Sequence, residues 1–116
     1  MEYQEEYPKK IKIKAGETDV YAFDITDGIE YGFGIQDYFG CIPLIDELHE
    51  EFIEWLMWFW YANPNDGKFP WNEYNAKGIE LTKKLSTILK GTGIEIFYQN
   101  IHIVTDERNS DLIKVN

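Results

Sequence analysis

Three side chains near the middle of the sequence have the spacing of metal ligands. Asp46, His49 and Glu50 lie at i, i+3 and i+4, which places them on one face of a helix. One helical turn offers at most these three ligands, and no second group of His or Cys follows elsewhere in the sequence. We therefore interpret them as a solvated polar face and predict no metal ion and no other cofactor.

The other arrangements that could perform catalysis are also weak. Cys41 could form a nucleophilic dyad with His49 or His102, but its surroundings match no cysteine-enzyme signature. Residues 32–34 (Gly-Phe-Gly) lack the later Gly and Lys of a phosphate loop. The many carboxylates would need one desolvated member opposed to another, which a sequence does not reveal. We predict no catalytic residue and no enzymatic activity.

The hydrophobic pattern predicts one domain over residues 1–116, with a disordered or loosely attached polar lead at residues 1–9. Alternating or β-rich segments predict an antiparallel meander, with strands at residues 11–14, 20–25 and 29–35. Later segments predict one or two short strands within residues 94–104 and an edge strand at residues 112–115.

Two consecutive helices are expected between these groups of strands. The first starts with Pro43 at the first helical position and ends at Tyr61. The second opens near Asn72 as its N-cap, continues to residue 90 and is closed by Gly91. Gly78, in its middle, indicates close packing against a Trp or the sheet. The predicted fold class is α+β: a largely antiparallel sheet with two consecutive helices packed on one face.

Charge is distributed very unevenly along the chain. Residues 1–60 hold fourteen of the 21 acidic residues and only four of the 11 basic ones, whereas residues 61–116 hold seven of each. The net charge of −10 therefore belongs to the first half. Such a surface repels nucleic acid and anionic membranes and attracts basic proteins, so we expect a basic protein partner, no nucleic acid and no membrane.

The first predicted helix places acids on one side. With about 100° per residue, its acids cover an arc of about 140°, and the large side chains of Met57, Trp58 and Tyr61 fall within or near that arc. Either the loop over residues 63–71 buries Trp58 and Tyr61, or they are aromatic anchors beside an acidic rim. The candidate contact residues on this helix are Glu47, Glu50, Glu51, Glu54, Trp58 and Tyr61. Acids near the turns of the meander form a second candidate group: Asp24, Asp27, Glu30 and Asp37.

Residues 70–81 (PWNEYNAKGIEL), followed by the strand at residues 94–98, resemble the small acidic immunity proteins of bacterial polymorphic-toxin and contact-dependent inhibition systems. This resemblance covers about a third of the chain and carries no functional residue across by position. It implies a cytosolic antidote that binds a cognate toxin, often a basic nuclease, and blocks its active site or substrate groove.

Other features agree with a cytosolic location. One cysteine excludes an intramolecular disulfide, residues 1–10 show no signal peptide, and the longest apolar run is too short to span a bilayer. Three alternatives to the immunity protein remain: a nucleic-acid-mimicking regulator of a host enzyme, a small structural or assembly protein, and an enzyme with an acidic site. The sequence leaves the oligomeric state open.

Overall fold

The computed structural model describes residues 9–15, 19–26, 31–40, 42–61, 70–100 and 112–115. Five strands form one sheet in the order β3-β2-β1-β4-β5. The strands are β1 (Lys10–Ala15), β2 (Val20–Asp24), β3 (Tyr31–Gly34), β4 (Glu95–Gln99) and β5 (Leu112–Lys114). All neighbouring pairs are antiparallel except β1 and β4, which run parallel. The predicted meander and the predicted edge strand are therefore confirmed.

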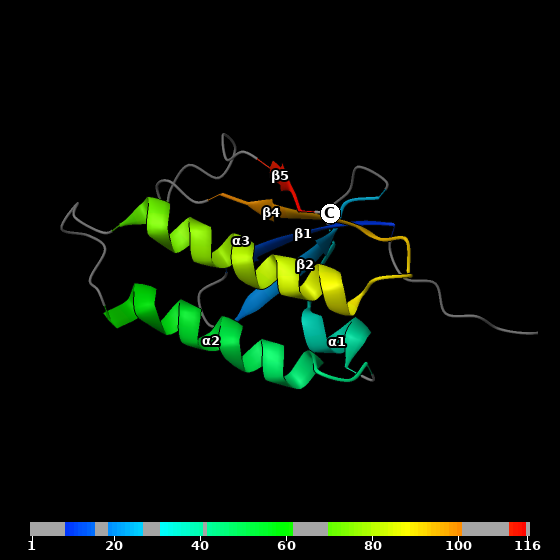
Figure 1. Ribbon diagram of the computed structural model, residues 1–116, viewed down its shortest axis with the longest axis horizontal. Helices are drawn as coiled ribbons and strands as arrows, with labels where there is room; N and C mark the ends of the chain where they lie inside the picture. Colours follow the sequence, from blue (N-terminus) through cyan, green and yellow to red (C-terminus); the bar gives the residue numbers. More distant parts are fainter. Residues whose placement is uncertain are drawn as a thin grey trace, which may run out of the picture.

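In the part of the chain that the structure describes, three helices lie between β3 and β4: α1 (Ile35–Phe39), α2 (Ile45–Tyr61) and α3 (Trp71–Ile88). Figure 1 shows α2 and α3 side by side in front of the sheet, where α2 contacts β2 and α3 contacts β4. The α+β class, with helices packed against a largely antiparallel sheet, is confirmed. Among the described residues, no helix is both long enough and apolar enough to cross a membrane.

The core lies between the sheet and the helices. Alternation along β1 sends Ile11 and Ile13 to the helix side, where they are fully buried. Ile96 and Tyr98 of β4 are their register partners and are buried on the same face. Above them, α2 and α3 contribute buried side chains at helical spacing. These residues are Ile45, Leu48, Phe52, Trp55, Leu56, Tyr74, Leu81 and Leu85.

Helix α1 was not predicted, because the sequence indicated a strand through Ile35. The strand ends at Gly34, whose amide donates a hydrogen bond of 2.9 Å to the Asp37 carboxylate. A carboxylate three residues ahead that accepts from the preceding backbone amide stabilises the first turn of a helix. Ile35 and Phe39 then lie four residues apart and are both fully buried.

The predicted helix boundaries need correction. The first long helix begins at Ile45, because Leu44 adopts a φ of 77° between it and Pro43. The second begins at Trp71 after an N-cap at Pro70, so Asn72 lies inside the helix and does not cap it. It ends at Ile88 with Leu89 as C-cap, and Gly91 follows at a φ of 97°.

The predicted loose lead at the start of the chain needs correction at Lys9. Lys9 was assigned to a loose lead, but its amide donates to Thr26 Oγ1 at 3.0 Å and its carbonyl accepts from Glu95 at 2.9 Å. Lys9 is therefore fixed to the sheet on both sides. The rest of the predicted lead and the strand expected at residues 101–104 lie outside the described residues.

Candidate functional site

Helix α2 presents one side to the core and the opposite side to solvent. The buried residues Leu48, Phe52 and Leu56 recur at intervals of four. The acids of α2 occupy the opposite side, where Glu47, Glu50 and Glu54 are exposed. The helix therefore forms as an amphipathic element whose acidic side the fold leaves uncovered.

Two acids at the edges of this side are held by neighbouring helices. Asp46 accepts a hydrogen bond of 2.7 Å from Gln36 Nε2 of α1. On the other edge, Lys84 Nζ of α3 lies 2.6 Å from Glu51 Oε1. Glu51, one of the candidate contact residues, therefore has its charge compensated within the fold.

The three glutamates between these edges have no such compensation. Glu47, Glu50 and Glu54 make no hydrogen bond or ion pair in the part of the chain that the structure describes. Glu50 also has an acid four residues away on each side, Asp46 and Glu54. Like charges at this spacing destabilise a helix by about 0.2–0.5 kcal/mol per pair. A basic partner would relieve this repulsion.

Two large side chains extend the acidic row toward the end of α2. Met57 is 44% exposed and Tyr61, the last helical residue, is 81% exposed. We use the name acidic stripe for Glu47, Glu50, Glu54, Met57 and Tyr61. Of the two aromatic candidates on this helix, Tyr61 is therefore accessible.

Trp58, the other aromatic candidate, is half-buried. Its ring lies 5.4 Å from that of Tyr74 on α3. Trp55 and Trp71 also contact Tyr74, at 4.5 Å and 6.0 Å between ring centroids. Trp58 therefore belongs to an interhelical aromatic cluster at the border of the stripe, and the loop over residues 62–69 lies outside the described residues.

The described acids near the turns of the meander accept hydrogen bonds from nearby backbone amides. Asp24 accepts from the amide of Thr26 at 2.9 Å, and Asp37 accepts from Gly34. Asp27 and Glu30 lie outside the described residues. The described meander acids are thus engaged in stabilising a turn and a helix start.

Of the residues considered for catalysis or metal binding, the structure describes Asp46, His49 and Glu50. His49 contacts Asp19 Oδ1 through Nε2 at 2.9 Å, which ties α2 to the start of β2. Within the described residues, no group of three or more His, Cys, Asp or Glu side chains could hold a metal ion. Cys41 and His102 lie outside those residues.

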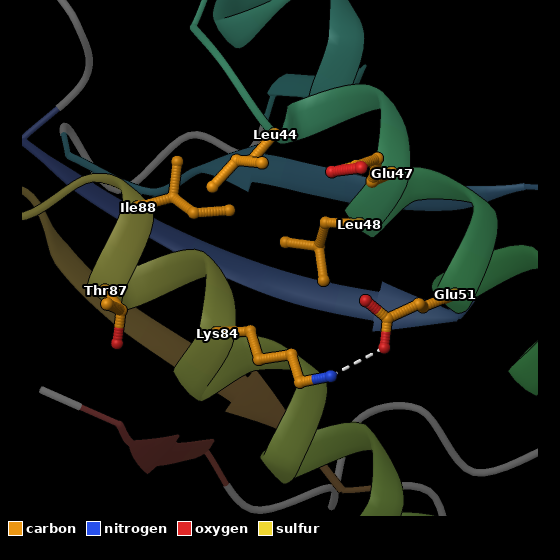
Figure 2. Close-up of a pocket in the computed structure, with 7 residues that line it drawn as sticks. All are labelled: Leu44, Glu47, Leu48, Glu51, Lys84, Thr87 and Ile88. Carbon is orange, nitrogen blue, oxygen red and sulfur yellow. Dashed lines mark hydrogen bonds and ion pairs between the residues drawn. The ribbon is translucent and has the colours of Figure 1, made fainter.

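Sequence reasoning missed a groove where the start of α2 meets the end of α3. Figure 2 shows its lining, which comes from both helices. The groove measures about 340 Å³ and is mainly apolar. Its lining residues are Leu44, Glu47, Leu48, Glu51, Lys84, Thr87 and Ile88. Glu47 belongs to both the groove and the acidic stripe, so the two are continuous.

The three lysines of β1 lie on the other face of the sheet. Because Ile11 and Ile13 face the helices, alternation places Lys10, Lys12 and Lys14 on the face of β1 that the helices do not cover. Lys12 Nζ lies 5.6 Å from the centre of the Phe23 ring, within the range of a cation–π contact. These three lysines therefore lie on the opposite face of the sheet from the acidic stripe, although Lys12 itself is only 8% exposed.

Comparisons with known proteins place no further constraint on this site. No protein-family model matches the sequence, and no match was found among curated proteins or among solved structures.

Proposed function

We propose that this chain is a protein-binding inhibitor, an immunity protein that neutralises a cognate basic toxin. The acidic stripe of α2 is the contact surface. The observation that carries the proposal is the row of uncompensated carboxylates at Glu47, Glu50 and Glu54, which continues into the exposed side chains of Met57 and Tyr61 at the end of the helix. The cytosol is the compartment where such an antidote acts.

The charged and the apolar side chains of the acidic stripe contribute to binding in different ways. Carboxylates that face the lysines and arginines of a toxin accelerate association of the two proteins and fix their relative orientation. A nuclease must present such cations to phosphates, so an acidic inhibitor competes directly for its substrate groove. Exposed Tyr61 and Met57 supply apolar area that slows dissociation.

The test is binding to the product of the gene adjacent to the one encoding this chain, with charge reversal in the stripe. Glu50→Lys/Glu54→Lys is compared with Glu73→Lys/Glu80→Lys, which changes the net charge equally on exposed positions of α3. We expect the stripe variant to lower the association rate at least tenfold and to weaken its salt dependence. The α3 variant should stay within about twofold of the unmodified protein.

Three results would contradict the proposal. Unchanged binding of the stripe variant rejects this face as the contact surface. Equal losses of association rate in both variants would show that only the net charge of the protein matters. A specific complex with a nucleic-acid enzyme encoded elsewhere, and none with the neighbouring product, favours a regulator that mimics nucleic acid.

A further inference from the structure

The groove between α2 and α3 has an apolar base and two apolar walls. Leu48 is almost fully buried beneath it, while Leu44 and Ile88 face each other across it (Figure 2). Leu44 is 60% exposed, although a leucine side chain gains from leaving water. An exposed leucine over an apolar depression is a surface that another side chain can complete.

The charge at the rim of the groove is negative. Lys84 is the one cation among the lining residues, and its ammonium lies on Glu51 at 2.6 Å. That hydrogen bond raises the pKa of Lys84 above its ordinary value, so the pair stays charged and internally neutral. Glu47 is therefore the uncompensated charge at the rim, and it continues into Glu50 and Glu54.

The backbone at Leu44 is in an unfavourable conformation. Its φ of 77° lies in the left-handed region, which costs a non-glycine residue about 1–2 kcal/mol. Such strain persists where the surrounding structure imposes it, and it concentrates at ligand-binding sites. Glycine or asparagine would occupy this position with less strain, but neither would supply the apolar wall.

We propose that this groove receives one apolar side chain of a basic partner segment, a leucine, methionine or phenylalanine flanked by lysine or arginine. The inference rests on the proposed function, because Glu47 joins the groove to the acidic stripe. A volume of about 340 Å³ is at the lower end of ligand sites, which suits a side chain and not a secondary-structure element.

A second copy of this chain is a poor occupant. It carries a net charge of −10, and its approach to a negative rim would be opposed by repulsion between like charges. A partner segment that brings positive charge beside an apolar anchor satisfies both the groove and the rim.

The test uses two synthetic peptides of equal charge, acetyl-Lys-Leu-Lys-Leu-Lys-amide and acetyl-Lys-Ser-Lys-Ser-Lys-amide, titrated into the isotopically labelled protein and followed by NMR. Both should shift the amide signals of Glu47, Glu50 and Glu54. The leucine peptide alone should shift the Ile88 methyl signals and the amides of Leu48 and Thr87. It should bind about tenfold more tightly, the effect of burying much of one leucine side chain.

Two variants remove the walls of the groove without touching the acids. Leu44→Asn is tolerated by the backbone at this φ, and Ile88→Ala shortens the opposite wall. Either should abolish the tenfold advantage of the leucine peptide while the serine peptide binds as before. Retention of that advantage in both variants would overturn the groove proposal.

The outcomes separate the two proposals. Equal binding of the two peptides at the stripe rejects the groove and leaves the proposed function standing. Failure of both peptides to shift Glu47, Glu50 or Glu54 rejects the stripe itself, and the groove proposal is rejected with it. Selective broadening of the signals of the groove residues without peptide would indicate self-association through the groove. A second copy would then be the occupant, which contradicts the proposal of a basic partner segment.

Discussion

The indole ring of Trp55 stacks on the phenol ring of Tyr74 at 4.5 Å between centroids, and its Nε1 donates a hydrogen bond of 2.9 Å to the Tyr74 carbonyl oxygen. The two residues belong to α2 and α3, so this double contact fixes the rotation of α2 about its axis. That rotation decides which residues of α2 meet solvent. The acidic stripe is thus positioned by an aromatic contact on the other side of the same helix.

Trp55→Phe should lower the free energy of unfolding by about 1–3 kcal/mol, because it removes a buried hydrogen bond and part of a stacked ring. Chemical denaturation measures this loss directly. Met57→Ala, at an exposed position two residues later, is the control and should change stability by less than about 0.5 kcal/mol. Equal effects of the two substitutions would show that the Trp55–Tyr74 contact does not hold the helices together.

Gly78→Ala should destabilise the protein although alanine is the better helix former. A Cβ at this position would lie 2.5 Å from Tyr98 Cε1 and 2.6 Å from Trp55 Cζ2. Overpacking of this kind costs about 1–3 kcal/mol, more than the gain of about 1 kcal/mol from helix propensity. Ala76→Gly, at an exposed position of the same helix, should lose about 1 kcal/mol and so calibrate the propensity. Thermal and urea denaturation of both variants provide the comparison, and a stabilised Gly78→Ala protein would contradict the packing argument.

The Gly78 packing is one of the features that the sequence predicted, because a helical glycine facing the core implies close approach. The acidic, solvent-facing side of α2 was predicted as well, since a 3.6-residue period is a local property. The edge strand at Leu112–Lys114 also follows from local residue types.

Features that depend on contacts between distant segments were not predicted. The parallel pairing of β1 with β4 joins strands that are separated in the chain by α1, α2 and α3, and no local pattern encodes it. The groove likewise forms from opposite ends of α2 and α3. The start of α2 was placed too early because Pro43 is compatible with a first helical position, whereas the φ of Leu44 is set by tertiary structure. The half-buried state of Trp58 depends on Tyr74, which belongs to the next helix.

Stability should fall as the pH rises above about 10. Burial raises the pKa of Tyr98 above its ordinary value, and the neighbouring Tyr74 adds to the shift; burial also raises the pKa of Tyr74. The folded protein therefore keeps both phenol protons to a higher pH than the unfolded chain. The stability that the two phenols contribute is complete below their pKa of about 10 in the unfolded chain. It is lost as the pH rises toward their pKa values in the folded protein.

Tyr98→Phe isolates this effect, because all lysines remain common to the two proteins. At neutral pH the variant should be less stable by about 1 kcal/mol, since it loses the 2.8 Å hydrogen bond from Tyr98 Oη to Asn75 Oδ1. Above pH 10 its stability should decline less steeply with pH than that of the unmodified protein. Urea midpoints measured between pH 8 and pH 11 give both quantities, and parallel declines would show that the Tyr98 phenol is not responsible.

Leu44→Asn should raise the free energy of unfolding by roughly 0.5–1 kcal/mol, because asparagine tolerates the left-handed region better than leucine does. Little burial is lost, since Leu44 is 60% exposed. Leu112→Asn is the matched control: the same substitution at a leucine of 44% exposure in β5, where no positive φ occurs, should be slightly destabilising. If urea denaturation shows that Leu44→Asn stabilises the protein and Leu112→Asn destabilises it, the backbone conformation at position 44 disfavours leucine. Because the same variant removes a wall of the groove, a more stable protein with weaker binding of the leucine peptide would link the strain to recognition. Equal destabilisation of both variants would show that packing of Leu44 outweighs its backbone strain.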